Sequence, residues 1–138
     1  MLARENVTLR ACSPWYRSPA FPNPEDPEYI NGVAAVDTDL SADALLALLH
    51  RIESDFGRIR RIKWESRVLD LDSIDHNGEV RTPEMEGPTL PHPRMQDRDF
   101  VLLPLRDVCP TWRHPASGHT IASLIDALEG PITAKKLW

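Results

Sequence analysis

Two aspartates separated by one leucine, Asp70 and Asp72, are the residues best suited to chemistry. In an extended segment successive side chains point to opposite faces, so the two carboxylates share one face while Leu71 points away. Neighbouring carboxylates repel each other, and both stay ionised only beside a cation or several donors. Mg²⁺ is such a cation, and its usual ligands are one or two carboxylates together with substrate phosphates. The spacing therefore favours a Mg²⁺ site, and the alternative is an exposed strand with two solvated aspartates.

A basic stretch precedes the aspartates and bears on what they bind. It holds five basic residues over ten positions: Arg58, Arg60, Arg61, Lys63 and Arg67. The whole chain carries a net charge of −5, which argues against a nucleic-acid partner because neutralising phosphates requires a basic face. A local basic cluster beside two carboxylates suits a small polyanion such as a nucleotide, and the alternative is a solvated surface stretch.

Length and cysteine content place the protein in a broad class. Residues 1–138 are expected to form one domain with a proper core. Cys12 and Cys109 have neither metal-binding nor redox spacing, and two thiols are too few for a disulfide framework, so we expect a reduced, cytoplasmic protein. The apolar runs are too short to span a membrane and no signal-peptide pattern opens the chain, so we expect no membrane partner.

Alternation of apolar residues and the placement of prolines predict the elements of the N-terminal half. The alternation over 7–12 predicts a strand running toward Tyr16. Prolines make residues 18–28 a stiff connection that is able to wall a pocket. A second strand is predicted over 29–36.

The clearest helix is predicted between Ser41 and Gly57. Ser41 is a good N-cap, apolar residues recur at helical spacing, and Gly57 ends the pattern. A strand over 67–74 then carries the aspartates, and a turn follows at 76–78. Residues 81–93 are expected to be irregular.

Two short helices are predicted near the C-terminus. They cover 96–106 and 120–128, and a tail over 129–138 follows. The order of strands and helices along the chain is therefore mixed.

Several segments match one family in the expected order. The chain resembles the 6-hydroxymethyl-7,8-dihydropterin pyrophosphokinase family from about Val7 to Leu128, through the segments Ser13–Pro19, Tyr29–Val33, Ile52–Glu53, Gly57–Arg58, Leu69–Asp72, Leu90–Met95 and Arg98–Leu105. The resemblance implies an α+β fold, a ferredoxin-like sandwich with helices packed on one antiparallel-rich sheet. It also implies transfer of pyrophosphate from ATP to 6-hydroxymethyl-7,8-dihydropterin in folate biosynthesis, giving AMP and the pterin diphosphate, by an enzyme that is a monomer when complete.

The resemblance assigns a role to each matching residue. It places Mg²⁺ on Asp70 and Asp72, and the transferring phosphates of ATP on Arg67 and Arg98. The other residues of the ATP site are Glu53, Arg58, Arg60, Trp64, Thr89 and His92. The residues of the pterin site are Ser18, Pro19, Tyr29, Asn31 and Phe100. Two aromatic rings would sandwich the pterin, while an amide and nearby backbone would meet its polar edge.

Three other interpretations stay open. The first is a truncated, inactive homologue that only binds nucleotide or pterin. The second is an Asp-x-Asp phosphatase with Asp70 as nucleophile and Asp72 as general acid, although that fold needs a parallel sheet with its aspartates early in the chain. The third is a structural interaction module. Taken singly, Tyr29 and Phe100 would more often be core residues, and His92 would more often be an exposed loop residue.

Three features depart from the family pattern. Glu65 and Ser66 stand where Gly-Pro is common, and Ser73 stands where an aliphatic residue often follows the second aspartate. The family's first strand, Gly-Ser-Asn-type loop and long helix have no counterpart, so residues 1–6 are expected to be a remnant of that helix. We expect the native reading frame to extend upstream by about 25 residues, the length of one strand, a loop and a helix.

Overall fold

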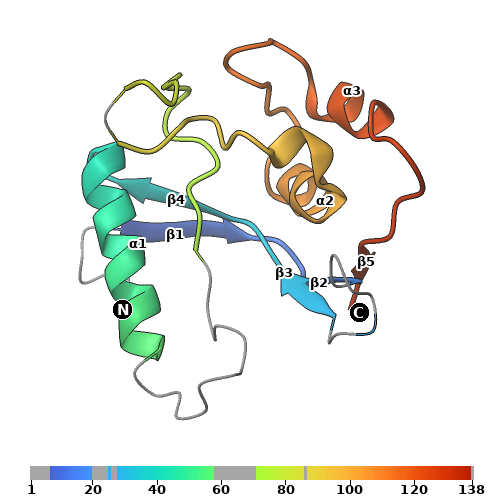
Figure 1. Ribbon diagram of the computed structural model, residues 1–138, viewed down its shortest axis with the longest axis horizontal. Coiled ribbons are helices and arrows are strands. Elements are labelled where there is room, and N and C mark those ends of the chain that lie inside the picture. Colours follow the sequence, from blue (N-terminus) through green and yellow to red (C-terminus); the bar gives the residue numbers. More distant parts are fainter. Residues whose placement is uncertain (1–6, 20–24, 26–27, 58–70, 86, 138) are drawn as a thin grey trace.

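Strands and helices follow one another in a mixed order along the chain. The computed structural model describes residues 7–19, 25, 28–57, 71–85 and 87–137 (Figure 1). Its strands are β1 (Val7–Cys12), β2 (Tyr16–Ser18), β3 (Tyr29–Asn31), β4 (Ala34–Thr38) and β5 (Lys135–Lys136). Its helices are α1 (Ala42–Gly57), the 3₁₀ turn η2 (Met95–Asp97), α2 (Asp99–Val108) and α3 (Ile121–Asp126). All strand pairs of these residues are antiparallel, so the predicted α+β class is confirmed.

The first four strands form one long hairpin with a bend in the middle. β1 pairs with β4 and β2 pairs with β3, in two separate small sheets. At the bend, Ser13 N donates to Val33 O at 2.8 Å and Val33 N donates to Ser13 Oγ at 2.9 Å, while Pro14 has no N–H to offer. The prediction of a single strand over 29–36 is therefore wrong. That segment is two strands, because a proline and a side-chain hydrogen bond interrupt the ladder.

Helix α1 covers the sheet formed by β1 and β4 (Figure 1). Ser41 Oγ accepts a hydrogen bond from Ala44 N at 3.1 Å, which satisfies one of the unpaired amides at the helix start. The apolar face of the helix is buried against β1, in a cluster of Val7, Leu45, Leu48 and Ile52. Burial of each large aliphatic side chain contributes about 1.5–3 kcal/mol. The helix predicted between Ser41 and Gly57 is confirmed.

A second core joins η2, α2 and α3. It consists of Met95, Leu102, Leu105, Ile121 and Leu124. Thr120 Oγ1 caps α3 by accepting from Ser123 N at 3.1 Å, so the helix predicted over 120–128 is present but starts one residue later and ends at Asp126. The helix predicted over 96–106 is present as η2 and α2, with extended backbone at Arg98 between them. No helix of the described ranges is long and apolar enough to cross a membrane.

The connection after α1 differs in part from expectation. The strand predicted over 67–74 lies partly outside the described residues, and its described part, 71–74, forms no strand. That part of the prediction is wrong because Leu71 N bonds to a side chain of α1 instead of a neighbouring strand. The turn predicted at 76–78 is confirmed by positive φ angles of 54° and 74° at its Asn-Gly pair.

The C-terminal stretch is tied into the second sheet. The tail predicted over 129–138 contains β5, which pairs with β2 and completes the strand order β3-β2-β5. Tyr16, Leu103 and Ala134 form a small buried cluster between β2, α2 and this stretch. The C-terminal stretch therefore helps to hold α2 against the strands.

Stability is expected to fall at high pH through Tyr16. Its side chain is 3% exposed, and burial followed by its hydrogen bond to Asp107 raises the pKa of Tyr16 from 10.0 to about 12. Because the folded-state pKa is the higher one, the stabilisation is complete below the unfolded-state pKa and is lost as pH rises between the two values. The expected loss is about 2–3 kcal/mol. Urea unfolding at neutral and alkaline pH should show it in the wild type and not in Tyr16→Phe, and equal pH slopes would contradict it.

Candidate active site

The hairpin formed by β2 and β3 presents three of the residues predicted for the pterin site. Tyr16 pairs with Asn31 and Ser18 pairs with Tyr29, and directly paired residues of antiparallel strands lie on the same face. Tyr16 packs against Leu103 of α2, so this face is turned toward α2. Tyr29 is 42% exposed, which excludes a core role for its ring. We name this surface the hairpin face; it consists of Tyr16, Ser18, Tyr29 and Asn31.

One polar group on the hairpin face lacks a partner. Ser18 is 3% exposed, and its Oγ has no hydrogen-bond partner among the described residues. Leaving a buried hydroxyl unpaired costs about 1–3 kcal/mol, and nearly all such groups in proteins are satisfied. The hydroxyl of Ser18 is therefore suited to meet the polar edge of a bound ligand.

Phe100 approaches the hairpin face from α2. It lies in the first turn of α2, is half-buried, and packs against the cluster of Tyr16, Leu103 and Ala134. The guanidinium carbon of Arg98 lies 5.5 Å from the centroid of the Phe100 ring, within the range of a cation–π contact. The structure thus brings a residue predicted for the pterin and one predicted for the phosphates side by side.

Asp72 and His92 also meet, from separate segments of the chain. His92 N donates to Ile74 O at 2.8 Å, which holds the His92 loop against the segment that follows Asp72. His92 Nε2 lies 3.9 Å from Asp72 Oδ2, and His92 Nδ1 accepts from Arg94 N at 3.3 Å. With Nδ1 accepting, a neutral His92 ring carries its proton on Nε2, the nitrogen nearer to Asp72.

Glu53 contacts the backbone of the aspartate segment. Its Oε2 accepts a hydrogen bond from Leu71 N at 2.5 Å, and Leu71 is the residue between the two aspartates. Because Glu53 belongs to α1, the helix fixes the backbone at this point. The structure shows this positioning contact, and the predicted contact of Glu53 with a nucleotide stays a prediction.

The remaining predicted site residues are Thr89 and Pro19, together with several that lie outside the described residues. Thr89 is half-buried. Pro19 lines a hollow of about 330 Å³, together with Arg17. The side chain of Arg17 lies on the opposite face of β2 from Ser18, so this hollow is separate from the hairpin face. The predictions that lie outside the described residues concern Arg58, Arg60, Trp64, Arg67, Asp70 and the helix remnant over 1–6.

Comparison with known proteins decides the family. Residues 1–110 match the family described as 7,8-dihydro-6-hydroxymethylpterin-pyrophosphokinase (HPPK). The chain belongs to this family. The segments quoted from the sequence up to Leu105 all lie within the matched range.

Bacterial relatives of the HPPK family extend along most of the chain. The 2-amino-4-hydroxy-6-hydroxymethyldihydropteridine pyrophosphokinase of Synechocystis sp. is 46% identical over 123 residues, which cover 89% of this chain and 62% of that protein. Proteins of the same name from Haemophilus influenzae and Pseudomonas aeruginosa are 38% and 40% identical, over 75% and 80% of this chain and 63% and 67% of their own lengths. The chain thus spans less than two thirds of the Synechocystis and Haemophilus proteins.

HPPK membership and the fold together overturn the phosphatase alternative. An Asp-x-Asp phosphatase of the kind considered needs a doubly wound parallel sheet. Every strand pair within the described ranges is antiparallel, and the aspartates come after half of the chain. The assignment of Asp70 as a nucleophile is therefore wrong.

The described residues fit the Mg²⁺ chemistry predicted for Asp72. No three His, Cys, Asp or Glu side chains among them are grouped closely enough to hold a metal ion by themselves. The side chain of Asp72 is 55% exposed, and His92 Nε2 at 3.9 Å is too distant to hydrogen-bond to it. Mg²⁺ is usually held by one or two carboxylates plus phosphate oxygens, so an accessible carboxylate of this kind is an appropriate donor.

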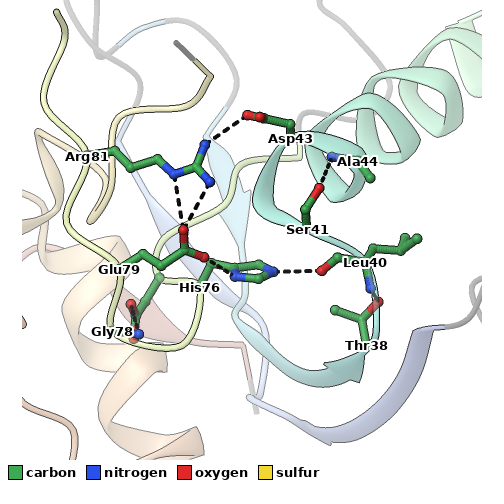
Figure 2. A network of polar contacts seen from close by, with 10 residues as sticks. Thr38, Leu40, Ser41, Asp43, Ala44, His76, Gly78, Glu79 and Arg81 are labelled. Carbon is green, nitrogen blue, oxygen red and sulfur yellow. Dashed lines mark hydrogen bonds and ion pairs between the residues drawn. The ribbon is translucent and has the colours of Figure 1, made fainter. Parts of the chain in front are cut away.

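A polar network that sequence reasoning missed holds the segment after the aspartates (Figure 2). His76 is 9% exposed, its Nδ1 lies 2.6 Å from Glu79 Oε2, and its Nε2 lies 3.0 Å from Leu40 O, both within hydrogen-bond distance. Arg81 donates to Glu79 Oε1 from Nε at 3.1 Å and from Nη2 at 3.0 Å, and its Nη1 reaches Asp43 at 3.0 Å. Arg81, followed by His76, holds the pKa of Glu79 below its usual value.

The network fastens residues 76–81 to the beginning of α1. Since α1 carries both Asp43, which binds Arg81, and Glu53, which binds Leu71, one helix supports the aspartate segment on both sides. The available sequence signal was the spacing of His76 and Glu79 around the Asn-Gly turn, which brings their side chains together. Their contact with Leu40 joins distant parts of the chain and has no local signal.

Proposed function

We propose that the protein transfers the pyrophosphoryl group of ATP to the hydroxymethyl oxygen of 6-hydroxymethyl-7,8-dihydropterin, as a cytoplasmic monomer of folate biosynthesis. The observation that carries the proposal is the hairpin face beside Phe100 in an HPPK chain, because it combines two aromatic rings with an unpaired buried hydroxyl. The substrate oxygen bonds to the β-phosphorus and loses its proton, the bond between that phosphorus and the bridging oxygen of the α-phosphate breaks, and AMP leaves.

The pterin binds between Tyr29 and Phe100 in this proposal. A flat bicycle gains affinity from stacking on both rings, and polar groups orient it. Asn31 and the hydroxyl of Ser18 lie on the same face as Tyr29 and meet the amide-like edge of the pterin. The backbone at Pro19 completes this edge.

The phosphates of ATP bind at Arg67 and Arg98, because a planar guanidinium can hold two oxygens at once. Arg98 lies beside the Phe100 ring, which sets the phosphates next to the bound pterin. His92 donates from Nε2 to a phosphate oxygen. The other residues of the nucleotide site are Glu53, Arg58, Arg60, Trp64 and Thr89.

Asp70 and Asp72 would hold Mg²⁺. When bound, Mg²⁺ neutralises phosphate charge and helps to align the reacting groups. The hydrogen bond from Leu71 N to Glu53 and the network around His76 fix the backbone on either side of Asp72. The contribution of the chain itself is to hold the carboxylates and the substrates in a defined arrangement, which can supply much of the rate of a transfer reaction.

Product analysis tests the proposal. Incubation with ATP, Mg²⁺ and 6-hydroxymethyl-7,8-dihydropterin should yield AMP and the pterin diphosphate in equal amounts by ion-exchange chromatography. ADP as the product, or phosphate released without pterin, would contradict it. Pterin binding without AMP formation would favour the second candidate, a homologue that only binds its ligands. This candidate is considered because the chain spans only part of the length of its relatives.

A further inference from the structure

Asp99 joins the start of α2 to the C-terminal stretch. It is the first residue of α2 and lies between Arg98 and Phe100. Its Oδ2 accepts hydrogen bonds from Thr133 N at 2.7 Å, Ala134 N at 3.0 Å and Thr133 Oγ1 at 3.3 Å. Hydrogen bonds to an ionised carboxylate are stronger than those between neutral groups, so this contact is a firm attachment.

The backbone held by this carboxylate lies beside the hairpin face. β5 pairs with Tyr16 and Arg17 of β2, and continuing that register by one residue places Ala134 next to Ser18. Both residues are buried, at 5% and 3% exposed. Phe100 packs against the cluster that contains Ala134. Asp99 is thus connected to both sides of the proposed pterin site.

The other end of α2 has a separate attachment. Asp107 accepts the hydroxyl hydrogen of Tyr16 and lies 3.8 Å from Lys136 Nζ. Asp107 therefore contacts β2 and β5, whereas Asp99, at the opposite end of α2, contacts the two residues that precede β5. Removing the carboxylate of Asp99 releases the N-terminal end of the helix while the C-terminal end stays attached.

We propose that Asp99 is a positioning residue that sets the spacing between the Phe100 ring and the hairpin face. The inference rests on the proposed function, in which Phe100 stacks on the pterin. A stack depends on the separation of two rigid rings, whereas long charged side chains can follow a phosphate through a small displacement. Loss of the Asp99 carboxylate therefore weakens pterin binding more than nucleotide binding.

The test compares three variants of the 138-residue chain by isothermal titration calorimetry. Asp99→Ala removes the acceptor, Asp99→Asn keeps an acceptor oxygen, and Asp97→Ala removes an exposed carboxylate of η2 as the matched control. The pterin is titrated in the presence of Mg²⁺ and a non-hydrolysable ATP analogue, and the analogue is titrated alone. We expect Asp99→Ala to raise the Kd for pterin about tenfold, or about 1.4 kcal/mol. The Kd for the analogue should change by less than about threefold, and Asp99→Asn and Asp97→Ala should stay within about threefold of the wild type for both ligands.

The outcomes separate this inference from the function on which it rests. A normal pterin Kd in a folded Asp99→Ala protein would overturn the positioning role and leave the proposed function standing. Equal losses for pterin and nucleotide, with a lower Tm, would indicate a structural role and overturn it as well. A wild type that binds no pterin would overturn the proposed function and this inference together.

Discussion

Asp72→Asn is expected to lower the turnover number about 10²-fold, the size of effect seen for single groups that stabilise charge in transfer sites. The amide has nearly the size of the carboxylate but lacks the negative charge that favours Mg²⁺. The side chain is more than half exposed, so the fold should tolerate the change. Rates of AMP formation at saturating ATP and pterin measure the effect, and Asp70→Asn should behave in the same way.

Two controls separate a metal role from a general loss of structure. Asp126→Asn changes an exposed carboxylate at the end of α3 and should leave turnover unchanged. Pterin binding without nucleotide should change little in Asp72→Asn. Near-normal turnover of Asp72→Asn, at the Mg²⁺ concentration that half-saturates the wild type, would show the metal assignment to be wrong.

Tyr29→Ala and Phe100→Ala should each weaken pterin binding by about 1–3 kcal/mol, the range for losing one aromatic stack on a flat base. Each variant removes one side of the proposed slot and keeps every phosphate-binding residue, although Phe100→Ala also removes the ring that contacts Arg98. Affinity for the ATP analogue should therefore fall much less than affinity for pterin. Calorimetric titration of pterin and of the analogue measures both quantities.

A neighbour of Tyr29 supplies the control for this experiment. Ile30 is 51% exposed and lies on the other face of β3, so Ile30→Ala should leave pterin affinity unchanged. For Phe100, which also packs on a buried cluster, Phe100→Leu keeps apolar volume without the ring and should still lose pterin affinity. Loss of both ligands to the same extent in Phe100→Ala and Phe100→Leu would indicate a core role for this residue.

Local patterns in the sequence were sufficient to predict some secondary-structure elements and to identify the family. α1 follows from a capping serine, a helical apolar period and a terminal glycine, all of which act between residues a few positions apart. The Asn-Gly turn after His76 is equally local, because both residues tolerate positive φ. The order of short motifs identified the HPPK family, since motif order needs no coordinates, and the site residues that it implies stay predictions.

Tertiary structure decided the features that join distant residues. The segment over 71–74 loses its predicted strand because Glu53, from α1, takes the amide of Leu71. The Asp99 carboxylate accepts hydrogen bonds from Thr133 and Ala134, which lie more than thirty residues away in the sequence. The hairpin face exists because the strand register pairs Ser18 with Tyr29. Sequence by itself determined the family and the position of α1. Only the folded chain decided which of the predicted site residues meet, because such contacts depend on packing between segments whose separation in sequence leaves no periodic or capping signal.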